Sequence, residues 1–277
     1  MGLYFTSINS GSNGNCYYVG NENEAILVDV GLTCKEVENR LTRLNLSLQK
    51  IKAIFISHEH SDHIKGVAVF AKKYKLPVYI SSLTLKSSKL LLNEDNVFPI
   101  SHLQKISIGN LNVFAFSKFH DAADPYSFTI ECNDTRVGVF TDIGSVCDRL
   151  ISQFKTCHAA FLEANYCAQI LANGSYPYFL KRRITSGHGH LSNKQALELF
   201  QNHKPDFMTH LLLSHLSKDN NDPELVEKIF KEIAGDTFIK VASRYEETEV
   251  FYVKRAQKEP AYKFNPYLYQ PDQLNLF

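Results

Sequence analysis

The sequence predicts an α/β protein in which two β-sheets pack face to face and helices cover their outer sides, an αββα sandwich. Short apolar runs rich in β-branched residues indicate strands, and over the first hundred residues they alternate with segments of helical spacing. Strands then dominate from Val97 to Phe140, after which helices return. This mixed order suits two packed sheets with helices outside.

The individual elements follow from local patterns. Residues 1–7 and 16–20 are β-prone and flank a loop whose glycines permit positive φ, which predicts a hairpin. Residues 24–57 indicate a strand–helix–strand unit, because Val37, Leu41 and Leu44 form one apolar stripe between two β-branched runs. Further helices are expected at 64–74, 83–92, 147–154 and 193–201, and further strands at 78–81, 159–163 and 210–214.

Length and composition indicate a single domain. The chain has 277 residues, of which 44% are hydrophobic and 21% charged, enough to bury one large core. We expect the domain to cover residues 1–253. Residues 254–277 contain Pro260, Pro266 and Pro271, which favour an extended C-terminal tail over a helix.

Charge and cysteine content restrict the environment and the partners. A net charge of +1 gives no global basic field, so a nucleic-acid surface must be a local patch. The basic runs 72–75 and 181–183 could contact a nucleic-acid backbone, and the alternative is that they are ordinary solvated faces. The 6 cysteines form no C-x-x-C pair, which favours reduced thiols. No apolar run is long enough to span a bilayer, so we expect a cytoplasmic protein without a membrane partner.

The densest group of potential metal ligands directly follows the apolar run 51–56. It consists of His58, His60, Asp62 and His63. A strand that ends in a tight loop can direct several such donors into one small volume. Crowded histidines would repel one another if protonated and would lose solvation if buried, and a divalent cation removes both costs. The sequence therefore predicts a metal site, against the alternative of a chance cluster.

The pattern H-x-H-x-D-H after a strand resembles the first metal motif of the metallo-β-lactamase superfamily. The resemblance covers about residues 3–253 and implies that the catalytic domain has the metallo-β-lactamase type of αββα sandwich. It also implies that Asp29 supports the site from below. Further metal ligands implied by the resemblance are His120, Asp142 and His215, each after a predicted strand.

The same resemblance implies a cofactor of two divalent metal ions. One ion would be bound by His58, His60 and His120, the other by Asp62, His63 and His215, with Asp142 as the bridge. Histidine-rich sites favour zinc, and manganese is the alternative because oxygen ligands also contribute. Two such Lewis acids suit phosphodiester hydrolysis, because they activate water and stabilise charge at phosphorus. Asp62 is also the predicted catalytic residue that orients this water or takes its proton.

Two polar segments are predicted to contact the substrate. Ser192 or Asn193 can cap the helix that follows, and free N–H groups at a helix N-terminus suit a phosphate. His190 is the predicted catalytic donor to the scissile phosphate or the leaving oxygen. Ser12 and Asn13, in the hairpin loop, are further substrate-binding candidates. The alternatives are a plain helix cap with solvent-facing histidines and a plain hairpin turn.

Residues 10–15, 120–125, 189–193 and 215–221 resemble the YycJ/WalJ group of bacterial single-domain exonucleases. This implies DNA as the substrate, 5′ to 3′ polarity and a role in DNA repair or replication. The group commonly has a histidine just after the position of Glu163, where this chain has Ala164, Asn165 and Tyr166. One alternative function is a thioester, lactone or cyclic-phosphate hydrolase, since the same motif serves those reactions. The other is a zinc-stabilised, non-catalytic scaffold.

The final residues resemble the Q-L-[SD]-L-F peptide by which bacterial replication and repair proteins dock on the DNA sliding clamp. Gln273 would fix the peptide, and Leu274, Leu276 and Phe277 would be its apolar anchors. Asn275 departs from the usual serine or aspartate. The alternative is that these residues pack on the domain or on a neighbouring subunit.

Overall fold

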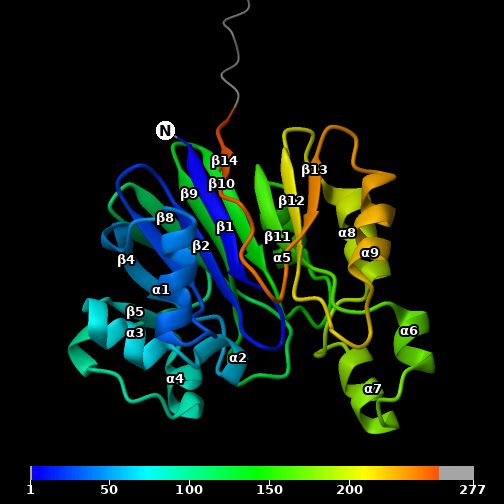
Figure 1. Ribbon diagram of the computed structural model, residues 1–277, viewed down its shortest axis with the longest axis horizontal. Coiled ribbons are helices and arrows are strands. Elements are labelled where there is room, and N and C mark those ends of the chain that lie inside the picture. The colour runs from blue at the N-terminus through cyan, green and yellow to red at the C-terminus, as the bar shows by residue number, and fades with distance from the viewer. Residues whose placement is uncertain (1, 256–277) are drawn as a thin grey trace, which may run out of the picture.

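Two seven-stranded sheets form the centre of the protein, seen in a computed structural model that describes residues 2–255 (Figure 1). The first sheet has the order β14-β1-β2-β3-β4-β5-β6 and consists of β1 (Leu3–Asn9), β2 (Cys16–Gly20), β3 (Ala25–Val28), β4 (Ile51–Phe55), β5 (Val78–Ile80), β6 (Val97–Pro99) and β14 (Phe251–Val253). The second has the order β13-β12-β11-β10-β9-β8-β7 and consists of β7 (Gln104–Ile108), β8 (Leu111–Ser117), β9 (Tyr126–Cys132), β10 (Thr135–Phe140), β11 (Ala159–Glu163), β12 (His210–Ser214) and β13 (Phe238–Val241).

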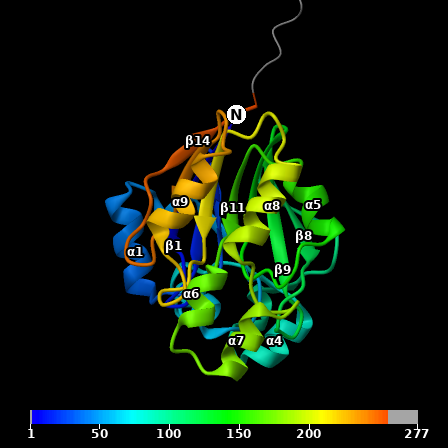
Figure 2. The same cartoon turned by 90° about the vertical axis from the view of Figure 1, so that its right-hand side faces the viewer.

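Helices cover the outer faces of both sheets, which confirms the predicted αββα sandwich (Figures 1 and 2). The helices are α1 (Cys34–Arg43), α2 (Ser61–Ile64), α3 (Val67–Tyr74), α4 (Ser82–Ser88), α5 (Asp148–Phe154), α6 (Ala168–Asn173), α7 (Tyr178–Thr185), α8 (Asn193–His203) and α9 (Pro223–Lys231). Apolar residues of α1 and α3 pack on the first sheet, and those of α5, α8 and α9 pack on the second. Each of these helices buries one apolar stripe.

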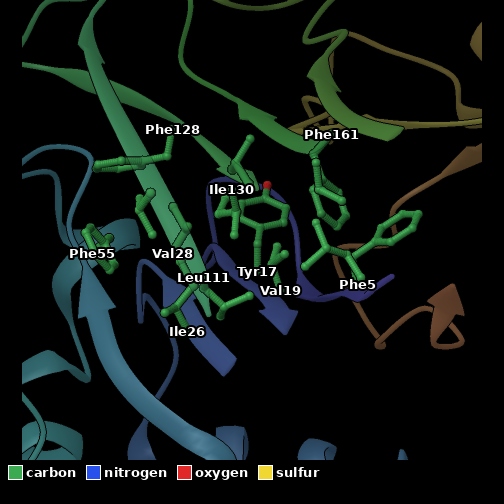
Figure 3. Close-up of a cluster of buried hydrophobic side chains, with 14 of the residues drawn as sticks. Phe5, Tyr17, Val19, Ile26, Val28, Phe55, Leu111, Phe128, Ile130 and Phe161 are labelled. Atoms are coloured by element: carbon green, nitrogen blue, oxygen red, sulfur yellow. The ribbon is translucent and has the colours of Figure 1, made fainter. Parts of the chain in front are cut away.

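Aromatic side chains fill the space between the two sheets (Figure 3). Phe55 of the first sheet meets Phe128 of the second with ring centroids 5.6 Å apart, and Phe5 meets Phe161 at 5.8 Å. Both pairs are edge-to-face, a favourable arrangement for aromatic rings. These contacts fix the two sheets relative to each other, which matters because the candidate site takes residues from both.

Parallel strands bring the predicted site residues to one end of the sandwich. β3, β4, β5 and β6 pair in parallel in the first sheet, and β10, β11, β12 and β13 pair in parallel in the second. The carboxyl ends of parallel strands lie at one edge, where ligand-binding loops gather. Helices α2, α6 and α7 lie at this end, the lower one in Figure 1.

The structure modifies several of the elements predicted from sequence. The helix expected over 64–74 begins only at Val67, as α3, and Gly66, whose N–H donates to the Val30 carbonyl oxygen, separates it from the short helix α2. A Cβ on Gly66 would lie 2.0 Å from the carbonyl oxygen of Leu32, so only glycine fits this approach. The helix expected over 83–92 ends at Ser88, and α2, α6, α7 and α9 were not predicted.

The last described strand, β14, ends at Val253, and the predicted boundary there stays a prediction. The predicted clamp-binding residues Gln273, Leu274, Leu276 and Phe277 lie outside the described residues. Within residues 2–255, the helices are all too short or too polar to cross a membrane.

Candidate metal centre

The predicted metal ligands meet at the carboxyl ends of strands from both sheets. His58 and His60 lie in the loop after β4, and Asp62 and His63 lie in α2, which follows that loop. His120 follows β8, Asp142 follows β10 and His215 follows β12. Asp142 and His215 have positive φ angles of 53° and 57°, an uncommon conformation that often marks functional sites.

One group of ring nitrogens comes from His58, His60 and His120. Nδ1 of His60 lies 3.0 Å from Nε2 of His58 and 3.4 Å from Nε2 of His120. One ligand atom from each of these residues falls within a common span of 4.8 Å. This is the trio that the sequence assigns to the first ion.

A second group contains Asp62, His63 and His215. Oδ2 of Asp62 lies 3.5 Å from Nε2 of His63 and 3.5 Å from Nε2 of His215. The three residues also offer ligand atoms within 4.8 Å of one another. This is the trio that the sequence assigns to the second ion.

Asp142 lies between the two groups. Its Oδ1 is 3.5 Å from Nε2 of His215 and 3.7 Å from Nε2 of His120, while Oδ2 is 3.2 Å from Nε2 of His63. Although Oδ2 is buried and close to His63, it accepts no hydrogen bond of acceptable geometry. A buried carboxylate oxygen without a donor suits a cation. The residues present therefore fit a dinuclear metal site with Asp142 as the shared ligand.

Burial and charge divide the histidines into two classes. Burial, reinforced by the charge on His63, holds the pKa of His58 well below its usual value, and burial lowers the pKa of His120 to about 3. Burial would also lower the pKa of His215, but the carboxylates of Asp142, Asp62 and Glu163 raise it to about 10. The pKa of His63 is likewise raised against the effect of burial, by Asp142 and Asp62. The carboxylates in and around the second group thus stabilise positive charge, which a divalent ion supplies.

Asp29 supports the centre from beneath, as the resemblance implies. Its Oδ2 lies 2.7 Å from Nδ1 of His63 and accepts a 2.7 Å hydrogen bond from Oγ of Ser57. The backbone N–H of Ser57 donates to Oδ1 of Asp29. Ser57 Oγ lies 2.8 Å from Nδ1 of His58. Because their Nδ1 atoms are engaged on this side, His63 and His58 present Nε2 to the centre.

Glu163, at the end of β11, is a site residue that the sequence did not single out. Its Oε1 lies 2.8 Å from Nδ1 of His190 and 3.1 Å from Nδ1 of His215. Its Oε2 accepts hydrogen bonds from the N–H groups of Ile143 and Leu191. The sequence did contain one signal for Glu163, which is a charged residue at the end of the apolar run 159–163.

A pocket of about 190 Å³ opens beside the centre and contains some of the predicted substrate residues. Ser12 and His190 line it together with His215 and Asn165. Nδ2 of Asn165 donates a 2.7 Å hydrogen bond to the carbonyl oxygen of His215. Asn165 therefore stabilises the loop that carries His215. The resemblance to the YycJ/WalJ group would place a histidine in this segment.

The other substrate candidates have partners within the protein. Ser192 caps α8 and shares a capping box with Gln195, and Asn193 exchanges two amide hydrogen bonds with Asn221. Nδ2 of Asn13 donates to the carbonyl oxygen of Arg244. The side chains of Ser192 and Asn193 are thus engaged within the protein, as in a helix cap, and contact of Ser192, Asn193 and Asn13 with substrate stays a prediction.

Comparisons with known proteins agree with this fold. A model of the metallo-β-lactamase superfamily matches residues 10–116. Exodeoxyribonuclease YycJ of Bacillus anthracis is 35% identical over 249 residues, which cover 89% of this chain and 94% of the relative. Exodeoxyribonuclease WalJ of Streptococcus pneumoniae serotype 2 is 34% identical over 232 residues, covering 81% of this chain and 86% of the relative.

Among solved structures, the metallo-β-lactamase fold protein YhfI from Bacillus subtilis matches with a TM-score of 0.71 at 19% identity. The match covers 91% of this chain and 99% of YhfI, and it supports the fold. Fold and centre together define a metal-dependent hydrolase. The chain belongs to the metallo-β-lactamase superfamily and is related to the YycJ and WalJ exodeoxyribonucleases.

Proposed function

We propose that the chain is a two-metal phosphodiester hydrolase that degrades DNA from 5′ ends, in DNA repair or replication. The observation that carries this proposal is the position of Asp142 within 3.7 Å of histidines from both groups. The similarity to YycJ over 89% of the chain supports DNA as the substrate. Zinc is the favoured metal because histidines predominate, and manganese is the alternative.

In the proposed reaction, two divalent ions would be held by His58, His60, His63, His120, Asp62, Asp142 and His215. When bound, the ions would make water nucleophilic near neutral pH and stabilise charge on the phosphate oxygens. Asp62, as an ionised carboxylate in the second group, would orient the attacking water or accept its proton at a carboxylate oxygen.

His190 is proposed to act at the leaving group. Its Nδ1 is engaged by Glu163, which leaves Nε2 as the ring nitrogen for a substrate oxygen. Donation of a proton or hydrogen bond from Nε2 to the departing oxygen requires the doubly protonated ring, whose Nδ1–H stays bonded to the Glu163 carboxylate. Ser12 would contact the phosphate. His190 lines the pocket and lies outside both ligand trios, which suits this role, although its ring also falls in a possible ligand group with Asp142, Glu163 and His215.

The test is a nuclease assay on 5′-labelled and 3′-labelled DNA, with zinc, manganese or magnesium added to metal-free protein. We expect mononucleotides to be released from 5′ ends and the highest turnover with zinc or manganese. Hydrolysis of a thioester or lactone without attack on DNA would instead favour the small-molecule hydrolase alternative. Absence of any hydrolysis by the metal-loaded protein would favour the scaffold alternative.

Clamp docking by Gln273, Leu274, Leu276 and Phe277 is a separate proposal that rests on their sequence alone. A docked tail would keep the enzyme on DNA through tethering. Titration of sliding clamp against the intact chain and a Leu276→Ala/Phe277→Ala variant tests it. Equal binding by both proteins would contradict it.

A further inference from the structure

Lys118 is a buried lysine that belongs to neither ligand group and takes no part in the proposed reaction. It is 6% exposed, and among residues 2–255 it is the only buried lysine. Lysine is almost never fully buried unless its amine has a partner, because removing the amine from water costs free energy. Nζ of Lys118 donates a 2.7 Å hydrogen bond to the carbonyl oxygen of Thr141. The buried amine is therefore held by a neutral backbone group.

The hydrogen bond of Lys118 joins two loops of the metal centre. Lys118 follows β8 and lies two residues before His120, while Thr141 follows β10 and directly precedes Asp142. Strand β9 lies between β8 and β10, so the hydrogen bonds of the sheet do not join these two strands. Nε2 of His120 and Oδ1 of Asp142 are nevertheless 3.7 Å apart. Lys118 thus links the strand end that carries a ligand of the first trio to the strand end that carries the shared ligand.

The backbone at Asp142 requires support, because its φ angle is 53°. Residues other than glycine rarely adopt a positive φ angle, and they keep it only where the surrounding contacts hold it. Three hydrogen bonds hold the backbone around Asp142: from Nζ of Lys118 to the Thr141 carbonyl oxygen, from the Ile143 N–H to Oε2 of Glu163, and from the Gly144 N–H to the Phe119 carbonyl oxygen. Lys118 supports the peptide before Asp142, and the other two bonds support the peptides after it.

An apolar side chain at position 118 would not replace this contact. It would avoid the cost of burying an amine, but the carbonyl oxygen of Thr141, a buried residue, would lose this donor. The peptide before Asp142 could then rotate, and both oxygens of the carboxylate would move with it. Such a rotation would affect the centre, since a misplacement of about 1 Å can lower a rate about 100-fold.

We propose that Lys118 is a positioning residue, which fixes the peptide between Thr141 and Asp142 and thereby aligns the Asp142 carboxylate with both ligand trios. The inference rests on the proposed two-metal function. It adds to that function a side chain that acts through Asp142 without contacting metal or substrate.

The spectroscopic test uses the full chain loaded with manganese, as wild type, Lys118→Met and Lys118→Arg. Methionine has a similar length but no donor, whereas arginine keeps N–H donors. Lys105→Met is the matched control, because Lys105 is an exposed lysine on β7 of the same sheet. Electron paramagnetic resonance distinguishes a coupled pair of Mn²⁺ ions from isolated ions. We expect the coupled signal to weaken in Lys118→Met and to persist in Lys118→Arg and in the control.

The kinetic test uses bis(p-nitrophenyl) phosphate, a small diester that requires only the centre. We expect kcat of Lys118→Met to fall about 10-fold or more with KM close to wild type, as for other residues that orient metal ligands. A coupled signal and a kcat equal to those of the wild type would overturn the proposal. A lower melting temperature with both quantities unchanged would also overturn it, because that result describes a purely structural lysine.

A crystal structure of the metal-loaded wild type decides the question if Lys118→Met does not fold. We expect Nζ of Lys118 to donate to the Thr141 carbonyl oxygen beside an Asp142 carboxylate shared by two ions, and loss of this contact would overturn the proposal. Failure of the wild type to cleave DNA would contradict the nuclease function, while the signal and the small diester still test Lys118. A manganese-loaded wild type without a coupled signal would overturn the two-metal function and the role of Lys118 with it.

Discussion

Glu163 and His190 form a pair at the edge of the pocket, with Oε1 2.8 Å from Nδ1. Glu163 is fully buried, and burial alone would raise its pKa, but His190 and His215 lower it to about 2. The carboxylate is therefore ionised at neutral pH and can hold both rings. One residue thus couples a proposed metal ligand, His215, to the proposed leaving-group donor, His190.

Replacing this carboxylate should affect catalysis more than folding. Glu163→Gln keeps the shape of the side chain but removes its charge and replaces one acceptor oxygen by an NH2 donor. The single remaining oxygen cannot serve both the two histidines and the N–H groups of Ile143 and Leu191. We expect kcat to fall about 10- to 100-fold, as for other residues that orient metal ligands. Steady-state kinetics with metal analysis checks this, and wild-type turnover in Glu163→Gln would show that orientation by Glu163 is unimportant.

His190→Ala should separate the substrate-facing histidine from the metal ligands. Loss of one donor to the transition state typically lowers kcat about 100-fold or more, and metal content should stay at the wild-type level. Inductively coupled plasma mass spectrometry alongside kinetics measures both quantities. A variant that loses an ion would reassign His190 as a ligand.

Gly31 permits the close approach of two loops at the centre. A Cβ at this position would lie 1.7 Å from the carbonyl oxygen of Asp62, so Gly31→Ala must displace the start of α2. We expect the free energy of unfolding to fall by about 1–3 kcal/mol or more, together with weaker metal binding. Gly187→Ala is the control, because an added Cβ there has no neighbour within 4 Å. Equal melting temperatures for the two variants would contradict this account.

Metal binding should release protons at neutral pH. The pKa of His215 is raised to about 10 and that of His63 well above its usual value, so both are protonated in the metal-free protein at pH 7.5. Ligation requires neutral imidazole, so we expect release of about two protons per chain and an affinity that increases with pH. Calorimetry in buffers of different ionisation enthalpy measures this number. Binding without proton release would show that the two histidines are neutral before metal arrives.

The sequence was sufficient where chemistry is concentrated in consecutive positions. His58, His60, Asp62 and His63 lie within one short segment after a strand, and the structure brings them together with His120, Asp142 and His215. The sandwich was predictable because alternation of strands and helices is a local property. The capping position of Ser192 was also visible, since serine before an amphipathic run is typical of a helix N-terminus.

Other features depend on contacts between distant segments. Glu163 is important because the fold brings His190, which is 27 residues further along the chain, into contact with it. A single glutamate forms no motif with a recognisable spacing. Helix α6 has only 6 residues, too few to show a period, and α7 begins with exposed aromatic residues instead of an apolar stripe. Helix α9 did have a signal, with Asp222 as N-cap, Pro223 at its start, and Val226 and Phe230 on one face.

The central claim is that Asp142 joins two ions into one hydrolytic centre. The most direct measurement determines metal content and exonuclease turnover of the wild type and Asp142→Ala, with circular dichroism to verify folding. We predict close to two ions per chain in the wild type, as the ligand set for a paired site requires. Asp142→Ala should stay folded, bind fewer ions and lose hydrolysis of DNA. Full turnover by a folded Asp142→Ala protein would contradict the two-metal mechanism.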